Sequence, residues 1–392
     1  MKFYALVFLV AAAVTYLAVP VVRQLAIMTN TLTPVRERDV HQFPTPRFGG
    51  IAMGIGFLVA MAIANHTSYL STAVDWQSTK GLVIGVGLIC LLGAIDDIWD
   101  IDWYTKLAGQ ILIAGLMAYL GIQLTTFPVF GLTIGSSRLS LFVTVFVVVA
   151  AINAVNFVDG LDGLAAGMMV IGATGLFIYS YTLTRTLGTE SYASLATTVA
   201  AALAGICLGF LPHNFSPASI FMGDTGAMLL GLLTAATAII VTGQIDPAVV
   251  YPRQVFPSFL PILLPLAVLA IPLFDMAASV IRRLYHRQSP FQADAKHLHH
   301  RLSQAGRSRV RAVLVMYIWT AVFSLGAASL TLLRMRYVVA LLVGASLFAL
   351  VITIEILPAW REGLRRRINP SYRRPRGPMH VQVPPNEPLS QS

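Results

Sequence analysis

The chain has 392 residues, of which 56% are hydrophobic and 11% charged, and its mean hydropathy is +0.74. Soluble domains carry about a quarter charged residues, so this composition excludes a set of soluble domains and indicates a polytopic membrane protein. The net charge of +10 does not indicate nucleic-acid binding, because the basic residues gather in alternate loops between apolar runs.

Eleven apolar runs are long enough to cross a bilayer as α-helices, which takes about 20 residues. No convincing small-residue cleavage site follows the first run, so we predict a transmembrane helix there rather than a removable signal peptide. Between the fourth and fifth runs, residues 123–138 alternate in polarity and contain Gly and Pro, which predicts a short extracytoplasmic hairpin. The predicted helices lie near residues 3–22, 48–65, 79–95, 106–122, 139–155, 163–183, 192–211, 225–242, 258–281, 312–333 and 337–357.

The lysines and arginines predict the orientation, because cytoplasmic loops carry an excess of these residues. The loops after odd-numbered helices, together with the C-terminal tail, contain 20 of the 27. We therefore expect the N-terminus outside and the C-terminus in the cytoplasm. The predicted fold class is an all-α polytopic membrane protein with about 11 transmembrane helices. Residues 1–360 form the predicted transmembrane domain, and residues 361–392 a basic, Pro-rich cytoplasmic tail that is predicted to be disordered.

Acidic residues and histidines occur in four clusters, and each cluster follows an odd-numbered helix. The predicted topology therefore places all four clusters at the cytoplasmic face, where they can meet in one plane. The clusters are Asp96, Asp97, Asp100 and Asp102 after the third helix, Asp159 and Asp162 after the fifth, Asp224 after the seventh, and His297, His299 and His300 after the ninth.

Each acidic cluster also has a purely structural explanation. An isolated aspartate at a membrane edge is most often a solvated loop residue. The adjacent Asp96 and Asp97 directly follow apolar sequence, where two carboxylates repel each other unless a cation offsets them. Asp159 and Asp162 would face the same way if the sixth helix begins there, whereas the neighbouring glycines could serve close helix packing alone.

The residue types in these clusters favour a hard cation. Oxygen ligands without thiolates suit Mg²⁺ or Mn²⁺ rather than Zn²⁺, and both cysteines, Cys90 and Cys207, lie inside apolar runs as packing residues. Mg²⁺ commonly binds one or two carboxylates together with substrate phosphates. With Lys106 and Arg301 on the same predicted face, the acidic plane suits a phosphate-bearing substrate. Two alternatives stay open for the histidine cluster, namely a metal site and a solvated loop.

One acid, Asp275, lies inside the predicted ninth helix. It precedes Arg282 by seven residues, which places it about 10 Å from the polar edge. An ionisable residue at that depth is a functional candidate. We expect Pro272 to kink the helix and turn Asp275 toward the site, but the sequence assigns it no role.

Five motifs carry these clusters, in order and on one predicted face: RERDVHQFPTPRFGG, DDIWDIDWYTKLAGQ, NAVNFVDGLDGLAAG, FLPHNFSPASIFMGDTG and PFQADAKHLHHRL. They resemble the motifs of the polyprenyl-phosphate N-acetylhexosamine-1-phosphate transferase superfamily, and especially of actinobacterial members of its WecA/TagO-like branch. The resemblance covers residues 36–311. It implies eleven transmembrane helices with cytoplasmic catalytic loops, and Mg²⁺-dependent transfer of GlcNAc-1-phosphate from UDP-N-acetylglucosamine to undecaprenyl or decaprenyl phosphate, with release of UMP.

The resemblance also implies a role for each matching residue. Asp224 and Asn156 look like ligands of Mg²⁺, with Mn²⁺ as the alternative metal. The positions that match catalytic acids are Asp96, Asp97, Asp159 and Asp162. The positions similar to substrate-binding residues are Lys106, Asn153, Asn214, His297, His299, His300 and Arg301.

The implied reaction needs little acid–base catalysis. A phosphate monoester has a second pKa near 6, so the lipid phosphate is mostly dianionic at pH 7. We therefore expect Asp97 to orient the acceptor or help to hold the metal rather than remove an essential proton. A single displacement is favoured over a double displacement through an aspartyl-phosphate.

Alternatives remain within and outside the enzyme class. The HLHH sequence at 297–300 differs from the three consecutive histidines typical of phospho-MurNAc-pentapeptide transferases and so favours GlcNAc, with that donor or another UDP-sugar as the alternative. A secondary transporter would place its ion sites near the bilayer midplane, whereas these candidates lie at one surface. The expected partners are UDP-GlcNAc, polyprenyl phosphate and membrane lipid but no nucleic acid, with a homodimer left open. The expected location is a bacterial plasma membrane, at the first membrane step of a cell-envelope polysaccharide.

Overall fold

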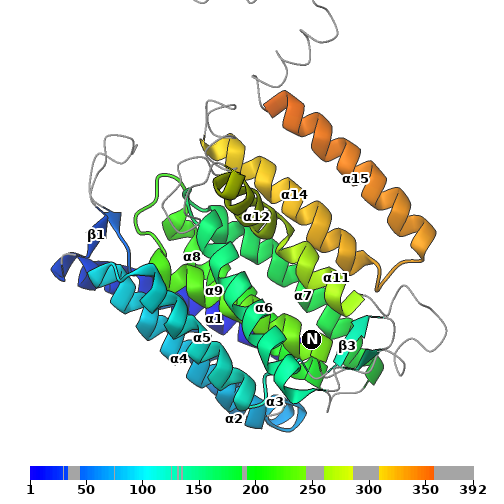
Figure 1. Ribbon diagram of the computed structural model, residues 1–392, viewed down its shortest axis with the longest axis horizontal. Helices are drawn as coiled ribbons and strands as arrows, with labels where there is room; N and C mark the ends of the chain where they lie inside the picture. Colours follow the sequence, from blue (N-terminus) through cyan, green and yellow to red (C-terminus); the bar gives the residue numbers. More distant parts are fainter. Residues whose placement is uncertain are drawn as a thin grey trace, which may run out of the picture.

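The helices of the computed structural model run alongside one another as a bundle (Figure 1). The structure describes residues 1–29, 31–33, 45–74, 76–124, 126–129, 132–133, 136–187, 192–243, 260–285 and 309–356. Because lipid offers no hydrogen-bonding partner to the backbone, apolar runs satisfy their N–H and C=O groups within helices. The long helices are α1 (Lys2–Met28), α2 (Gly49–His66), α4 (Trp76–Trp99), α5 (Trp103–Tyr119), α6 (Ser137–Val158), α7 (Leu164–Leu187), α8 (Tyr192–Asn214), α9 (Gly223–Gly243), α14 (Arg309–Ser329) and α15 (Met335–Ile356).

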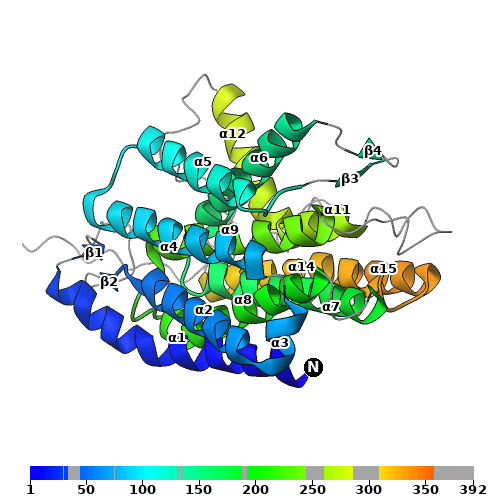
Figure 2. The same ribbon diagram turned by 90° about the horizontal axis from the view of Figure 1, so that it is seen from below.

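Two short antiparallel hairpins extend from opposite ends of the bundle (Figure 2). One pairs β1 (Leu32–Thr33) with β2 (Thr45–Pro46) in the connection between α1 and α2. The other pairs β3 (Thr126–Val129) with β4 (Leu132–Thr133) between α5 and α6. This second hairpin confirms the hairpin predicted within residues 123–138.

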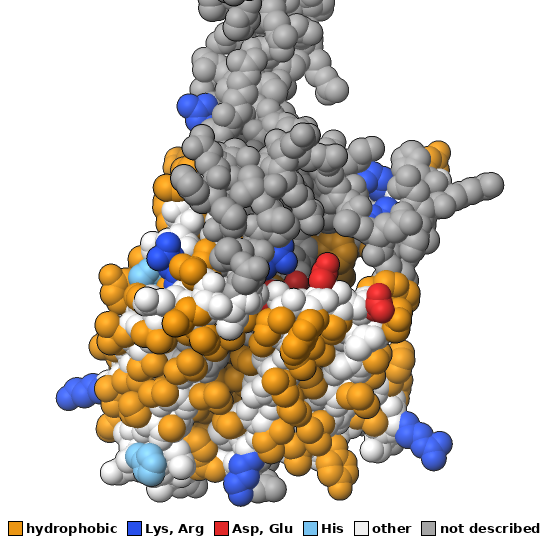
Figure 3. All heavy atoms as spheres, turned by 90° about the vertical axis from the view of Figure 1, so that its left-hand side faces the viewer, with side chains coloured by type: hydrophobic (Ala, Val, Ile, Leu, Met, Phe, Trp, Pro, Cys, Tyr) orange, Lys and Arg blue, Asp and Glu red, His pale blue; other side chains and the backbone are white. Residues whose placement is uncertain are grey.

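A helix occupies the position of each of the eleven predicted apolar runs. Among the described residues, nine helices are long and apolar enough to cross a membrane. At the fourth position α5 has 17 residues, and at the ninth the run is divided into α11 (Leu260–Val268) and α12 (Ala270–Tyr285). A short helix, α3 (Ser68–Ala73), precedes α4. The predicted all-α polytopic membrane fold is therefore confirmed. On the face drawn in Figure 3, hydrophobic side chains form a broad belt, and the described acidic side chains visible in this view gather at one edge of that belt.

Helix α9 lies in the interior of the bundle. Every residue of its membrane-spanning window is buried, compared with 17% for the peripheral α15, and α9 packs against α2, α4, α6 and α8. Gly231 permits the close contact with α6, since a Cβ atom at this position would lie 2.4 Å from the Cα atom of Ile152. The N-terminus of α9 consequently reaches the centre of one end of the bundle.

The boundary between α6 and α7 lies close to the predicted one. Helix α6 ends at Val158 and α7 begins at Leu164, so Asp159 and Asp162 lie in the intervening turn and do not share a helical face. Gly163 has a φ of +74°, a conformation that a helix interior does not accept but that glycine adopts readily. The shared helical face considered for Asp159 and Asp162 required the sixth helix to begin at Asp159 and is therefore excluded, whereas the predicted start of that helix near residue 163 is confirmed.

The predicted ninth helix breaks at Leu269, three residues before Pro272. Proline has no N–H group and so cannot donate to the carbonyl of Val268. A new helix therefore begins at Ala270, and Pro272 lies in its first turn, where N–H groups have no intrahelical partner. Asp275 lies on α12 with 3% of its surface exposed, which confirms its burial. Its function stays untested.

Candidate active site

The ends of four helices meet at one end of the bundle and bring together four predicted site residues. Lys106, near the start of α5, places its Nζ atom 2.6 Å from Asp96 Oδ2 on α4 and 2.5 Å from Asp224 Oδ1 on α9. Asn156, near the end of α6, donates from Nδ2 to the same Asp224 oxygen at 2.6 Å. The acidic motifs after the third, fifth and seventh predicted helices therefore converge.

A sharp turn between α4 and α5 fixes Asp96 and Lys106 relative to each other. Asp100 adopts a φ of +50°, and its N–H donates to the Asp96 carbonyl at 2.8 Å. The N–H of Ile101 donates to Asp96 Oδ1 at 3.1 Å. One carboxylate oxygen is thus held by the backbone while the other contacts Lys106. Asp100 and Asp102 are exposed, in agreement with the alternative of solvated loop residues.

The charges of this cluster do not balance. A single ammonium group contacts two carboxylates, and the side chain of Asp96 is only 4% exposed while that of Asp224 is 29% exposed. Carboxylates that share a poorly solvated site repel each other unless positive charge offsets them. Among the groups in contact here, Lys106 supplies one positive charge for two negative ones, so the site is suited to a second cation.

A further carboxyl group, that of Asp159, is affected by this excess of negative charge. Its removal from water, followed by the negative charges of Asp224, Asp97 and Asp162, raises the pKa of the Asp159 carboxyl to about 8. A carboxyl group with this pKa is largely protonated at pH 7. The protein alone therefore does not hold all of these carboxyl groups ionised at once.

The ligand types of the site fit Mg²⁺. Within the described ranges, no three His, Cys, Asp or Glu side chains form a group that could hold a metal ion without other ligands. Mg²⁺ commonly binds one or two carboxylates and takes its other ligands from water and substrate phosphates. Asp224 and Asn156 are adjacent hard donors of the required kind, because rotation of the Asn156 amide presents either its nitrogen or its oxygen.

The second member of the predicted acidic pair, Asp97, faces α9 rather than Lys106. Its Oδ1 accepts the N–H of Asp224 at 2.8 Å, and its Oδ2 accepts both the N–H of Thr225 at 3.1 Å and the Thr225 hydroxyl at 2.7 Å. Both oxygens are therefore engaged with the first turn of α9. The two adjacent aspartates therefore contact different elements: Asp96 contacts Lys106 on α5, and Asp97 contacts the start of α9.

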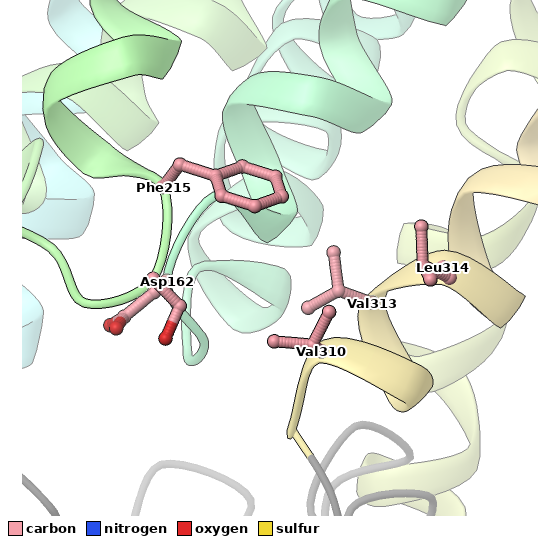
Figure 4. Close-up of a pocket in the computed structure, with 6 residues that line it drawn as sticks. Asp162, Phe215, Val310, Val313 and Leu314 are labelled. Carbon is pink, nitrogen blue, oxygen red and sulfur yellow. The ribbon is translucent and has the colours of Figure 1, made fainter.

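Asp162 lies beside a small apolar hollow (Figure 4). Its Oδ2 accepts the N–H of Ala218 at 3.2 Å, which ties the turn after α6 to the segment before α9. The hollow has a volume of about 10 Å³ and is lined in addition by Phe215, Ser216, Val310, Val313 and Leu314. This volume suits one water molecule, so the described hollow holds no substrate group.

Two asparagines that were predicted to bind substrate have hydrogen-bond partners within the protein. Asn214 accepts the N–H of Gly163 and donates to the carbonyl of Ile220, both at 3.0 Å. Asn153 donates to Gln110 Oε1 at 2.7 Å and to its own helix at 2.8 Å. Asn214 thus links the turn after α6 to the segment before α9. Substrate contact by either residue stays a prediction.

Some predicted residues lie outside the described part of the chain, namely His297, His299, His300, Arg301 and the tail at 361–392. Conversely, Thr225 and Gln110 contact predicted site residues although neither was predicted from the sequence. Thr225 had a detectable signal, since it stands two residues after a glycine at the start of an apolar run, where polar groups commonly contact helix ends. Gln110 had no such signal, apart from being a polar residue in an apolar run.

Comparisons with known proteins agree with this geometry. Residues 79–242 match the family described as Glycosyl transferase family 4. The chain is 39% identical to a decaprenyl-phosphate N-acetylglucosaminephosphotransferase of Mycobacterium tuberculosis, over 92% of this chain and 90% of the relative. Its identity to the Mycolicibacterium smegmatis protein of the same description is 40%, over 92% and 89%. The undecaprenyl-phosphate alpha-N-acetylglucosaminyl 1-phosphate transferase of Escherichia coli K12 is 30% identical over 74% of each chain.

Proposed function

This chain belongs to the polyprenyl-phosphate N-acetylhexosamine-1-phosphate transferase superfamily, in its WecA/TagO-like branch, and we propose that it transfers GlcNAc-1-phosphate from UDP-GlcNAc to a polyprenyl phosphate. The products are UMP and polyprenyl-diphosphate-GlcNAc. The observation that carries this proposal is the convergence of Asp96, Lys106, Asn156 and Asp224 from four helices at one end of the bundle.

The reaction is a phosphoryl transfer, which asks a protein mainly for positioning and charge neutralisation. The lipid phosphate attacks the β-phosphorus of UDP-GlcNAc in line, and the bond from this phosphorus to the oxygen bridging the two phosphates breaks. UMP departs with that oxygen and its electron pair. Lys106 lies at the centre of the site, where its ammonium group can contact a phosphate oxygen of either reactant.

Asp224 and Asn156 would hold the Mg²⁺ ion that this proposal requires, with Mn²⁺ as the alternative. When bound, Mg²⁺ neutralises charge on the donor diphosphate and on the departing UMP. Asp96, whose Oδ2 lies 2.6 Å from Lys106 Nζ, helps to keep Lys106 in place. No role as a proton acceptor is assigned to Asp159, because its raised pKa of about 8 applies to the site without a bound cation. The dianionic lipid phosphate needs no such acceptor.

The relatives favour a decaprenyl carrier. Proteins described as decaprenyl-phosphate N-acetylglucosaminephosphotransferases are 39–40% identical to this chain, whereas the Escherichia coli undecaprenyl-phosphate enzyme is 30% identical. We therefore propose decaprenyl phosphate as the acceptor. Rates measured with decaprenyl and undecaprenyl phosphate at equal concentration test this choice, and a preference for the shorter lipid contradicts it.

The activity test uses purified full-length protein with UDP-GlcNAc, polyprenyl phosphate and Mg²⁺. We expect UMP and a lipid-linked GlcNAc diphosphate in equal amounts, and no UMP when the lipid or the metal is left out. UMP release without a lipid product would indicate hydrolysis and overturn the proposal. A parallel assay with UDP-MurNAc-pentapeptide shows whether the enzyme prefers that donor to UDP-GlcNAc. A secondary transporter would release no UMP from either donor.

The proposed location is a bacterial plasma membrane with the site on the cytoplasmic side and the N-terminus outside. Support comes from the 20 of 27 lysines and arginines in the loops and tail assigned to the cytoplasm. Both native cysteines lie within helices, so single cysteines introduced into loops can be labelled with impermeant reagents in intact cells. Labelling at Asp100→Cys from outside would contradict the proposed orientation. A homodimer stays a prediction.

A further inference from the structure

Helix α9 begins without a side-chain acceptor of its own. The first N–H groups of a helix have no partner within it, and a Ser, Thr, Asp or Asn just before the helix normally accepts from the second or third of them. The residue before α9 is Met222, whose thioether is a weak acceptor. The N–H groups of Asp224 and Thr225, which follow Gly223, therefore need an acceptor from elsewhere in the protein.

Asp97 on α4 supplies that acceptor across 127 residues of sequence. Its two oxygens accept the N–H groups of Asp224 and Thr225, which are the second and third of the helix, and one of them also accepts the Thr225 hydroxyl. A carboxylate at a helix N-terminus is further stabilised by the helix dipole. Thr225 is wholly buried and Asp97 is 8% exposed, so water competes little for these bonds.

Two glycines make this contact fit tightly. A Cβ atom on Gly93, one turn before Asp97 on α4, would lie 2.4 Å from Thr225 Cα. A Cβ atom on Gly223, whose φ is +69°, would lie 2.6 Å from Asp97 Oδ1. The two helices therefore meet backbone to backbone, and Asp97 reaches the first turn of α9 at short range. The position of Asp224 along and around α9 follows from this contact.

We propose that Asp97 and Thr225 are positioning residues that hold the first turn of α9 so that Asp224 Oδ1 points to Lys106 and Asn156. Three of the roughly four acceptor sites of Asp97 are used in doing so, which favours a positioning role for Asp97 over proton transfer or metal binding. The inference rests on the proposed function only in treating Asp224 as the metal-binding carboxylate. The hydroxyl group of Thr225 is then a determinant of metal affinity.

The test compares Thr225→Val, which removes the hydroxyl at nearly constant shape, with Thr225→Ser, which keeps it. Thr237→Val is the matched control, because Thr237 is equally buried on the same helix and its hydroxyl bonds to the carbonyl of Leu233. Binding of Mn²⁺ to the full-length protein in detergent is measured by electron paramagnetic resonance, and kcat and KM for UDP-GlcNAc are measured in parallel.

We expect Thr225→Val to weaken Mn²⁺ binding by about 10- to 100-fold, as loss of groups that orient metal ligands commonly does, and to lower kcat with KM changed less than about twofold. Thr225→Ser should stay close to wild type in both, as should Thr237→Val. Wild-type Mn²⁺ affinity in a folded Thr225→Val protein would overturn the proposal. An equal loss in Thr225→Ser would also overturn it, because the effect would then come from packing.

Asp97→Asn provides a second measurement if Thr225→Val does not give folded protein. The amide keeps one oxygen acceptor and opposes an N–H donor with its own NH₂ group, so we expect Mn²⁺ affinity to fall at least as far. Unchanged affinity would contradict the role of Asp97. Mn²⁺ binding does not depend on turnover, so a wild-type protein that binds Mn²⁺ but makes no product would disprove the proposed function and leave this inference standing.

Discussion

Lys106 and Asp224 are 118 positions apart in the sequence, yet Lys106 Nζ lies 2.5 Å from Asp224 Oδ1. The same ammonium group lies 2.6 Å from Asp96 Oδ2. One cation on α5 thus holds together carboxylates from α4 and α9 in a poorly solvated place. The charge of this site, rather than its shape alone, decides what it can bind and how its variants behave.

Replacing Lys106 with glutamine should reduce both stability and activity. Asp96 and Asp224 would then face each other without their shared cation. We expect the free energy of unfolding to fall by about 1–3 kcal/mol, less than the 3–5 kcal/mol typical of a fully buried pair that loses one partner, because Lys106 is 19% exposed. We also expect turnover to fall at least 100-fold. Melting temperature and UMP release measure the two effects. Lys80→Gln, at an exposed position on α4, is the control and should match wild type.

Asp224→Asn should abolish most of the activity without preventing membrane insertion. The substitution removes the carboxylate of the proposed metal pair, so we expect turnover to fall by about 100-fold or more and Mn²⁺ binding to weaken. UMP release and membrane-fraction yield are the measurements. Asp102→Asn, which changes an exposed aspartate in contact with Tyr104, should retain activity. Normal turnover in Asp224→Asn would remove this residue from the metal site.

The raised pKa of Asp159 predicts a pH-dependent contribution to stability. This carboxyl has a pKa of about 8 in the folded protein and about 3.9 in an unfolded chain. Between these values the folded state holds one more proton than the unfolded state, so the contribution of Asp159 to stability falls as pH rises from roughly 4 to 8. Asp159→Asn removes this dependence and should melt higher than wild type at pH 9.

Thermal unfolding of the wild type and of Asp159→Asn at pH 5, 7 and 9, with a chelator present, measures the effect. The chelator is needed because a bound divalent cation favours the ionised carboxyl. The difference in melting temperature should grow with pH in favour of the variant. Parallel curves would show that Asp159 is not protonated in the folded protein at neutral pH.

Gly223→Ala should destabilise the start of α9. The residue has a φ of +69°, and an added Cβ atom would lie 2.3 Å from the Arg47 carbonyl oxygen. Such a backbone conformation costs a residue with a side chain on the order of 1–3 kcal/mol. Gly87→Ala on α4 is the control, because nothing lies within 4 Å of its added Cβ atom and alanine favours helices. The control should melt at or slightly above the wild-type temperature, whereas a stable Gly223→Ala would show that the turn adapts.

The helices were predictable from sequence because each is a long apolar run whose backbone has no alternative partner in lipid. The meeting of Asp96 and Asp224 was predictable as well, since counting the helices places both at the same end of the bundle, whereas Asn156 was added by resemblance. Lys106 was placed beside the acidic residues by the predicted topology and by resemblance, and the structure adds its contacts with Asp96 and Asp224. Residues far apart in the sequence could be predicted to meet because each loop of a membrane protein lies at one of only two surfaces.

Local geometry was harder to predict. The turn that separates Asp159 from α7 depends on the left-handed conformation of Gly163, and a glycine in sequence does not reveal whether it packs a helix or ends one. The break at Leu269 came three residues before the proline that causes it. Asp96 contacts Lys106 whereas Asp97 contacts the start of α9, and the second contact joins residues 127 positions apart. No rule based on sequence spacing predicts such a contact.

The late position of α9 in the chain has a consequence for biosynthesis. Helices enter the membrane in order as the ribosome delivers them, so the α4–α5 hairpin is inserted well before Asp224 and Thr225 have been translated. A nascent chain at that stage has the Asp96–Lys106 pair but no first turn of α9 to receive Asp97. The contact of Asp97 with the first turn of α9 therefore forms only after α9 has been synthesised, and residues 297–301, which are predicted to bind substrate, are translated later still.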